Sequence, residues 1–348
     1  MTMTPAAGSS WTPPEHWRRI TAIDAHTGGE PLRIYTGGYP EAPGATILER
    51  RRYCADHMDD LRTATVWEPR GHADMYGCII TPPERLDSDF GVIFTHNEGY
   101  SSMCGHGIIA VTTVALTTGM LPWREGEIEV RIDSPAGLIV AWATTSSGQV
   151  TGVRFHCVPS FAAILDERVT VPGVGEVCFD IAYGGAFYAF VDAASLGLAD
   201  DAGNAAALID AGVRIKTALL DHPAISHPFQ EELAFLYGTI FTGAPQQPGS
   251  DTRNVCIFAD GELDRSPTGT GVSARLAIAA ARGELQPGGE LVYESIIGSQ
   301  FRGRIDSELD YGPHRAVVPE VSGRAHICGR QEFFLDPDDP LCKGFLLR

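Results

Sequence analysis

The chain contains the stretch Ser102-Met103-Cys104-Gly105-His106-Gly107 and, about half its length further on, the stretch Asp264-Arg265-Ser266-Pro267-Thr268-Gly269-Thr270-Gly271. The two share one pattern, because Cys104-Gly-x-Gly-x-x-Ala matches Thr268-Gly-x-Gly-x-x-Ala. The first stretch therefore has a thiol where the second has a hydroxyl. The repeat predicts a duplicated fold, and the difference between its two copies bears directly on the chemistry.

Each stretch lies between a strand-like run and a helix-like run. Apolar residues 92–94 and 255–258 precede the two stretches, and residues 108–121 and 272–285 follow them with helical character. A strand, a glycine turn and a helix start make an anion cradle, because the first N–H groups of a helix have no internal partner and its dipole favours negative charge. Two cradles predict one acidic ligand held between two halves.

Further patterns surround the cradles. Strands are expected within residues 19–25, 91–94, 127–158, 169–191, 232–242, 252–259, 291–297 and 316–321. Helices are expected at residues 46–61 and 194–220, and at 107–119, which is apolar almost all round and so expected to be buried. These elements predict an α/β (α+β) fold in which two pseudo-symmetric domains each place antiparallel strands around a central buried helix.

The repeat also sets the expected domain organisation. We place the first domain at residues 1–159 together with 330–348, and the second at residues 160–329. The tail from residue 331 is too short to fold alone and is expected to dock on an existing domain. The active site is expected in the cleft between the two domains.

Composition indicates a soluble globular protein and does not exclude an acidic small-molecule substrate. Hydrophobic residues make up 44% and charged residues 20% of the chain, and its net charge of −18 argues against nucleic acid or an anionic membrane as the main partner. No apolar run approaches the length of a membrane span, and residues 1–16 lack a hydrophobic signal core. We therefore expect a cytoplasmic protein.

Cys104 is the cysteine with the clearest chemical context. The eight cysteines are scattered without a C-x-x-C pair, so we expect neither a zinc site nor a dense disulfide framework, and most should be reduced core residues. A thiol just before a helix is different, because the helix terminus lowers its pKa from about 8.5 into the range of about 3.5 to 7.5. Such a thiolate can act as a nucleophile or as a base, whereas the alternative is an inert core cysteine.

Two other interpretations of the glycine stretches are weaker. Cys104 and His106 do not have a usual zinc spacing, and no further Cys/His pair completes it. Both stretches match the Gly-x-Gly-x-x-Ala dinucleotide pattern, but they lie deep in the chain outside repeating βαβ units and lack a well-placed ribose-binding acid. We therefore favour neither a zinc site nor a dinucleotide site at these residues.

At these residues the chain resembles the proline racemase family, which has the diaminopimelate-epimerase-like fold. The resemblance covers nearly the full chain and includes four further segments: Asp24-Ala25-His26-Thr27-Gly28-Gly29-Glu30-Pro31, Glu68-Pro69-Arg70-Gly71-His72, Asp74-Met75-Tyr76-Gly77 and Tyr183-Gly184-Gly185. In that family two cysteines face each other across the substrate α-carbon, and no cofactor is used. One thiolate removes the α-proton and the other thiol returns a proton to the opposite face.

The second cysteine is missing here. Cys104 matches the first, but Thr268 stands in place of the second, a departure that matches the family's dehydratases of trans-3-hydroxy-L-proline. A threonine hydroxyl is far less acidic than a thiol, so two-base racemisation is expected to fail. With a hydroxyl on C3, the carbanion can lose water, and the enamine tautomerises to Δ1-pyrroline-2-carboxylate.

The resemblance also implies site roles by motif position. Cys104 is the base and Asp264 contacts the cationic ring nitrogen. For Thr268, which departs from the family pattern, our hypothesis is a hydrogen bond to the substrate, for example at its leaving hydroxyl, and the alternative is that it merely fills space. The substrate carboxylate is expected at the backbone N–H groups of Gly105, His106, Gly269 and Thr270. His106, as a neighbouring cation, would favour the thiolate. Cys256 is a conceivable surrogate second base, although its place in a strand favours a core role.

Three functions remain open at this point. The first is a cofactor-independent hydro-lyase acting on trans-3-hydroxy-L-proline. The second is a 4-hydroxyproline 2-epimerase or proline racemase with an unrecognised second base. The third is a non-catalytic amino-acid binding protein of the same fold. The expected partner is a small imino acid, and a homodimer is admissible because the sequence does not fix the oligomeric state.

Overall fold

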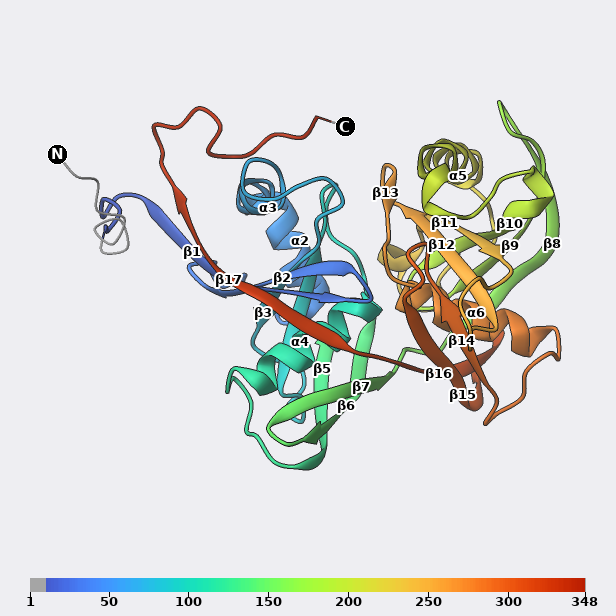
Figure 1. Cartoon of the computed structure of the whole chain (residues 1–348), viewed down its shortest axis with the longest axis horizontal. Helices are drawn as coiled ribbons and strands as arrows, with labels where there is room; N and C mark the ends of the chain where they lie inside the picture. The colour runs from blue at the N-terminus through green and yellow to red at the C-terminus, as the bar shows by residue number, and fades with distance from the viewer. Residues whose placement is uncertain (1–10, 348) are drawn as a thin grey trace.

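The computed structural model describes residues 11–347, which form two lobes side by side (Figure 1). The first lobe contains β1 (Arg18–Thr27), β2 (Glu30–Gly37), α2 (Ile47–His57), α3 (Asp59–Val66), β3 (Gly77–Thr81), β4 (Phe90–Thr95), α4 (Gly105–Thr117), β5 (Gly126–Ser134), β6 (Gly137–Ser146), β7 (Gln149–His156) and, from the end of the chain, β17 (Ala325–Leu335).

The second lobe is formed by the intervening chain. It contains β8 (Phe161–Val171), β9 (Gly175–Tyr183), β10 (Phe187–Asp192), α5 (Ala205–Leu219), β11 (Leu236–Gly243), β12 (Thr252–Phe258), β13 (Glu262–Leu263), α6 (Gly269–Ala281), β14 (Glu290–Glu294), β15 (Gln300–Tyr311) and β16 (His314–Gly323). Short 3₁₀ turns occur at η1 (Ala193–Leu196), η2 (Ala202–Asn204) and η3 (Glu231–Leu233).

The strands form one large mixed sheet that runs through both lobes. In the first lobe the pairing order is β17–β1–β2–β3–β4–β5–β6–β7, parallel at β2–β3 and β4–β5 and antiparallel elsewhere. In the second it is β8–β9–β10–β11–β12–β14–β15–β16, parallel at β10–β11 and β12–β14. The two orders have the same polarity at every step, and antiparallel pairing of β7 with β16 joins them.

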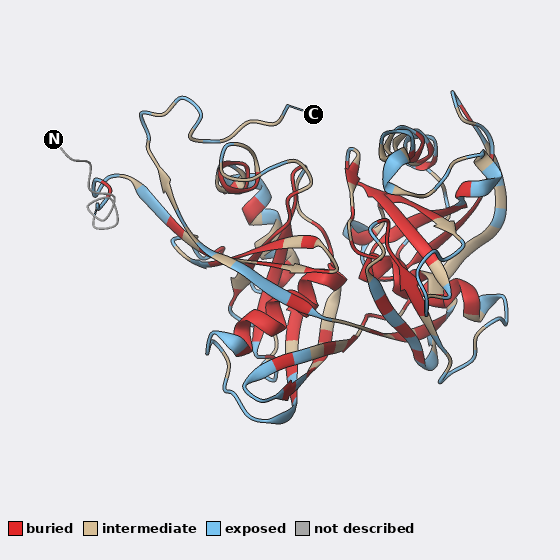
Figure 2. Ribbon diagram, viewed as in Figure 1, coloured by how far each residue is buried: buried red, intermediate tan, exposed pale blue. Residues whose placement is uncertain are grey.

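One buried helix lies at the centre of each lobe. Every residue of α4 from Gly105 to Leu116 is buried, and the helix packs against β1, β6, β7 and β17. Helix α6 is buried along most of its length and packs against β8, β9, β15 and β16. Both helices are apolar around most of their circumference, so only an interior position removes their side chains from water (Figure 2).

The outer helices have one buried face instead. In α5 the buried residues Leu208, Ala211, Ile215 and Leu219 recur at the helical spacing of three to four. Helix α2 begins with a capping box, in which the Thr46 hydroxyl accepts from the Glu49 N–H and the Glu49 carboxylate accepts from the Thr46 N–H.

Most expected elements are present, and the differences have local reasons. The region 194–220 becomes helical only at Ala205, because 3₁₀ turns capped by Asp192 and Asp201 come first. Strand β17 begins at Ala325 and pairs with β1 over its whole length, so the C-terminal segment does dock on the first lobe. Strands β2, β3, β13, β15 and β17 are additional to the sequence predictions, and β8 begins at Phe161, before the predicted strand region 169–191. The exact division into two domains stays a prediction.

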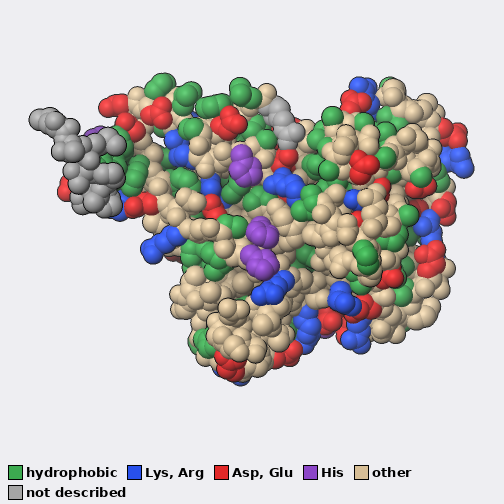
Figure 3. Space-filling view, viewed as in Figure 1, with side chains coloured by type: hydrophobic (Ala, Val, Ile, Leu, Met, Phe, Trp, Pro, Cys, Tyr) green, Lys and Arg blue, Asp and Glu red, His purple; other side chains and the backbone are tan. Residues whose placement is uncertain are grey.

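The surface carries charged side chains of both signs. On the face drawn in Figure 3, Lys and Arg side chains are interspersed with Asp and Glu, and a notch lies between the two lobes at one edge. Among the helices of residues 11–347, none has the length and apolar character needed to cross a membrane.

Candidate active site

The N-termini of the two central helices meet at Gly105 of α4 and Gly269 of α6. A Cβ built on Gly105 would lie 2.5 Å from the Cα of Gly269, and one built on Gly269 would lie 2.7 Å from the Cα of Gly105. Only glycine allows this backbone-to-backbone approach. The positive ends of two helices, with their unpartnered first N–H groups, therefore converge on one place.

The turn between β9 and β10 also approaches this point. A Cβ on Gly184 would lie 2.2 Å from the Thr270 carbonyl oxygen, and the Gly185 carbonyl accepts from the Ser102 hydroxyl at 2.7 Å. The turn needs glycine here, because a side chain at Gly184 would meet the backbone of α6. It ties the second lobe to the segment that leads into α4.

A small cavity lies where the helices meet. It has a volume of about 20 Å³ and is lined by Tyr76, Met103, Cys104, Gly105, His106, Tyr188, Tyr237, Cys256, Phe258, Asp264, Thr268, Gly269 and Thr270. All seven residues that the sequence analysis assigned to the site are in this group, and each of them is buried. The space is enough for about one water. Binding of an imino acid ring therefore requires the lobes or the lining side chains to move.

Cys104 is the N-cap of α4. Its Sγ accepts from the Gly107 N–H at 3.2 Å, which favours the thiolate, as predicted for a helix terminus. Burial acts more strongly in the opposite direction, and the nearby carboxylates of Asp264 and Glu30 add to it, so the pKa of Cys104 is raised well above its ordinary value. The prediction of a lowered pKa is wrong for this closed arrangement, because the sequence does not show how completely the thiol is buried.

His106 is placed to exchange a proton with Cys104. Its Nδ1 lies 3.2 Å from the Cys104 Sγ, and its Nε2 lies 3.2 Å from the Pro31 carbonyl oxygen. A carbonyl only accepts, so Nε2 carries the hydrogen and Nδ1 presents a lone pair to the thiol. Burial lowers the pKa of His106 to about 4, so this side chain is neutral near pH 7 and the prediction of a cationic His106 is wrong. A neutral imidazole can accept the thiol proton.

Thr268 faces the cavity from the second lobe. Its hydroxyl donates to Asp264 Oδ2 at 2.8 Å, while Asp264 Oδ1 accepts from the Ser266 N–H at 2.7 Å. The hydroxyl hydrogen of Thr268 is therefore committed to Asp264. Thr268 has a φ of 64°, a left-handed conformation that is strained for a β-branched residue and that marks functional positions more often than structural ones.

Cys256 lies beside Thr268 on the same side of the cavity. It belongs to β12 and lines the cavity, and burial together with the nearby Asp264 carboxylate raises its pKa well above the ordinary value. The structure thus gives Cys256 both a core position and a place in the cavity wall. It is the one thiol that the second lobe contributes to this cavity.

Three tyrosines of the cavity wall were missed by the sequence analysis. The Tyr76 hydroxyl donates to Ser101 at 2.7 Å and lies 2.9 Å from that of Tyr237, and the Tyr188 hydroxyl lies 2.7 Å from the Thr270 hydroxyl. Tyr76 occurs in a segment already noted for its resemblance. Tyr188 and Tyr237 sit in strand-like runs, where nothing in the local pattern separates a cavity-lining tyrosine from a core tyrosine.

A buried ion pair links the lobes beside the cavity. Glu30 Oε2 accepts from the backbone N–H of Arg265 at 2.8 Å and lies 3.1 Å from its Nε. The Glu30 side chain is fully buried, and burial together with the Asp264 carboxylate raises its pKa. Next to it, the Gly28 carbonyl accepts from the Ser299 hydroxyl at 2.8 Å. The segment at residues 26–31 thus makes direct contacts with the second lobe.

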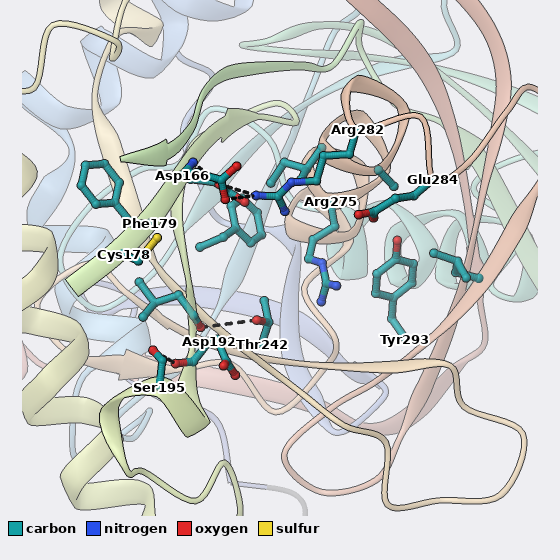
Figure 4. Close-up of a pocket in the computed structure, with 16 residues that line it drawn as sticks. Asp166, Cys178, Phe179, Asp192, Ser195, Thr242, Arg275, Arg282, Glu284 and Tyr293 are labelled. Atoms are coloured by element: carbon teal, nitrogen blue, oxygen red, sulfur yellow. Dashed lines mark hydrogen bonds and ion pairs between the residues drawn. The ribbon is translucent and has the colours of Figure 1, made fainter. Parts of the chain in front are cut away.

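A larger cavity of about 360 Å³ lies within the second lobe (Figure 4). Its charged groups are largely matched, because Arg282 bridges Asp166 and Asp180, and the Arg275 guanidinium donates to Thr252 and Asn254. It contains none of the residues around the helix N-termini. Within residues 11–347, no cluster of three or more His, Cys, Asp and Glu side chains is arranged to hold a metal ion.

Comparison with known proteins agrees with this geometry. A trans-3-hydroxy-L-proline dehydratase of Colwellia psychrerythraea is 49% identical over 96% of this chain and 94% of its own length. A 3-hydroxyproline 2-epimerase of Burkholderia multivorans is 46% identical over 95% of this chain and 99% of its own. A crystal structure of a hydroxyproline epimerase from Agrobacterium vitis with bound trans-4-hydroxy-L-proline superposes with a TM-score of 0.91, at 33% identity and 96% coverage of both chains.

The family model for proline racemase matches residues 22–346. The match includes both cradles, the segments that carry the resemblance and nearly every strand of the sheet. On this evidence the chain belongs to the proline racemase family.

Proposed function

We propose that the protein is a hydro-lyase that dehydrates trans-3-hydroxy-L-proline to Δ1-pyrroline-2-carboxylate without a cofactor. The observation that carries this proposal is the state of Thr268, whose hydroxyl hydrogen is directed at Asp264 Oδ2, 2.8 Å away. The second lobe therefore presents a poor proton donor where a racemase needs an acidic thiol. Relatives named trans-3-hydroxy-L-proline dehydratase, 46–49% identical to this chain, support the same function.

The fold supports a site built between two equivalent halves. We propose two pseudo-symmetric domains of the diaminopimelate-epimerase-like type, the first at residues 1–159 with the C-terminal segment and the second up to the start of β17. Support comes from the matching strand order and polarity of the two lobes, each with its buried helix following the fifth strand of that order. The ligand would then lie where α4 and α6 touch.

The residues around the cavity suit a zwitterionic imino acid. The substrate carboxylate would be held by the first N–H groups of the two helices, at Gly105, His106, Gly269 and Thr270. Its ring ammonium would lie against the Asp264 carboxylate. The aromatic rings of Tyr76, Tyr188 and Phe258 would pack against the apolar ring atoms and exclude water.

Cys104 would be the base in this arrangement. Transfer of its proton to Nδ1 of His106, 3.2 Å away, makes the thiolate that removes the α-hydrogen. The carbanion then expels the C3 hydroxyl rather than taking a proton from the opposite face, because Thr268 cannot readily supply one. The resulting enamine tautomerises to the cyclic imine.

Product analysis tests the proposal. Purified protein is incubated with trans-3-hydroxy-L-proline, and the imine is trapped with o-aminobenzaldehyde while chiral chromatography follows the amino acid. We expect imine at the rate of substrate loss and no epimer. Formation of the 2-epimer without imine would contradict the proposal.

An epimerase is the second candidate, and the relative named 3-hydroxyproline 2-epimerase favours it. Such a reaction needs a proton donor on the second lobe, and Cys256 is the thiol there that lines the cavity. A Cys256→Ala variant separates the two functions. A dehydratase with one base keeps its imine formation in this variant, whereas an epimerase that uses Cys256 loses its epimer.

A further inference from the structure

The stereochemistry of the proposed substrate restricts where its leaving group can lie. In trans-3-hydroxy-L-proline the C3 hydroxyl is trans to the carboxylate, so it lies on the same ring face as the α-hydrogen. The base that removes that hydrogen therefore faces the departing hydroxyl as well. Hydroxide is a poor leaving group at neutral pH, so a proton donor is needed on this face.

Few groups on the first-lobe side of the cavity can donate that proton. The polar side chains there are Tyr76, Cys104 and His106. The Tyr76 hydroxyl donates to Ser101, and burial raises its pKa, so its hydrogen is not available. Thr268 lies on the opposite side, and its hydrogen is committed to Asp264.

We propose that His106 is the general acid that protonates the departing hydroxyl, on the same face from which Cys104 takes the α-hydrogen. This inference rests on the proposed dehydratase function. Nδ1 of His106 lies 3.2 Å from the Cys104 Sγ, so a hydroxyl in contact with that sulfur is within reach of both atoms. Nε2 is fixed by the Pro31 carbonyl, which keeps Nδ1 directed at the reacting groups.

The proton balance closes within one turnover. The thiol proton of Cys104 moves to Nδ1, and the resulting thiolate takes the α-hydrogen. The electron pair of that C–H bond becomes the C2=C3 double bond, the C3–O bond breaks with its pair on oxygen, and the oxygen takes the proton from Nδ1 to leave as water. Cys104 is again a thiol and His106 is again neutral. The low pKa of His106, about 4, and the raised pKa of Cys104 mean that protonated His106 is a minor, transient species and a strong acid for this step.

This role of His106 differs from the hypothesis that Thr268 hydrogen-bonds the leaving hydroxyl. If Thr268 contacted the leaving hydroxyl, the hydroxyl would lie on the face away from Cys104, as it does in cis-3-hydroxy-L-proline. The same-face arrangement leaves Thr268 as a donor that completes the hydrogen bonding of Asp264. The two assignments therefore predict opposite preferences between the diastereomers.

The first test uses the wild-type protein with the two diastereomers in heavy water. We expect elimination from cis-3-hydroxy-L-proline to be at least about 100-fold slower than from the trans isomer, in keeping with the loss of a general acid. Elimination from the cis isomer within tenfold of the trans rate would overturn the inference. A wild type that does not convert the trans isomer at all would refute the proposed function instead.

The second test varies the leaving group. His106→Gln keeps an amide N–H for the Pro31 carbonyl but removes Nδ1, and trans-3-fluoro-L-proline loses fluoride without needing a full proton. We expect kcat/KM of the variant to fall about 10²–10³-fold for the hydroxyl substrate. The fold-loss for the fluoro substrate should be at least about tenfold smaller than this. Thr268→Val serves as the control. The ratio of its kcat/KM values for the hydroxyl and fluoro substrates should equal the wild-type ratio. Equal losses for both substrates in His106→Gln would overturn the inference.

Discussion

The contact between Gly105 and Gly269 makes a sharp prediction. In a Gly105→Ala variant the new methyl would lie 2.5 Å from the Gly269 Cα, whereas carbon atoms in contact prefer about 3.5–4.0 Å. The obstacle is backbone, which cannot rotate away, so the N-termini of α4 and α6 must separate by about 1 Å. Overpacking of this kind costs about 1–3 kcal/mol of stability. A displacement of about 1 Å in a catalytic site costs about 10²-fold in rate.

The assay is kcat/KM for imine formation together with urea unfolding. Gly152→Ala is the matched control. Gly152 lies in β7, the strand that joins the two lobes, and a Cβ built on it would have its nearest neighbour, the Gly323 carbonyl oxygen, at 3.8 Å. We expect about a 10²-fold loss for Gly105→Ala and little change for Gly152→Ala. A Gly105→Ala variant with wild-type kcat/KM would refute the argument that the converging helix ends build the site.

Three further variants test single groups. Cys104→Ser should lose imine formation by more than about 10³-fold while unfolding in urea like the wild type, and retention of full turnover would remove Cys104 as the base. Thr268→Cys should introduce α-deuterium into trans-4-hydroxy-L-proline in heavy water, and no incorporation would contradict our account of the second cradle. His106→Gln should be less acid-sensitive than the wild type. Buried His106, with a pKa lowered from 6.5 to about 4, stabilises the fold above pH 6.5, and this contribution is lost at up to about 1.4 kcal/mol per pH unit between 6.5 and 4. If the free energy of unfolding in urea fell equally with decreasing pH in the wild type and in His106→Gln, this prediction would be wrong.

Local chemistry made the cradles predictable. Each combines an apolar strand, glycines and an apolar helix, and these signals lie within about 30 consecutive residues. The structure accordingly has β4 before α4, and β12 before α6 with only the short β13 between. Convergence of the cradles is what the repeat predicts, since equivalent positions of a duplicated fold are expected to meet near its pseudo-symmetry axis.

Long-range features escaped the sequence analysis. The pairing of β17 with β1 joins the two ends of the chain, and no local pattern at Ala325–Leu335 identifies its partner. Strand β2 was not predicted, since Gly28, Gly29 and Pro31 are residues typical of turns, although the strand begins at Glu30. The ion pair of Glu30 with Arg265 was also not predictable from local patterns, because it connects residues far apart in the chain.

The pKa shifts of Cys104 and His106 could not be predicted from the sequence, because they depend on how deeply the fold buries these side chains. A helix N-terminus lowers a cysteine pKa when the thiol is solvated, but here burial of Cys104 outweighs the Gly107 N–H. Burial likewise makes His106 neutral instead of cationic. Both effects depend on side chains such as Tyr76, Tyr188 and Tyr237, which reach the cavity from three separate elements of the fold.

The central claim is that one base, Cys104, acts in a site without an effective second donor. It is tested most directly by proton NMR of the wild-type protein in heavy water with trans-3-hydroxy-L-proline, and with proline and trans-4-hydroxy-L-proline in parallel. We predict conversion of the first compound to pyrroline-2-carboxylate with no epimer, and no second diastereomer from the others. Appearance of a 2-epimer of trans-4-hydroxy-L-proline carrying α-deuterium would contradict the claim, because Thr268 or Cys256 would then be delivering a proton.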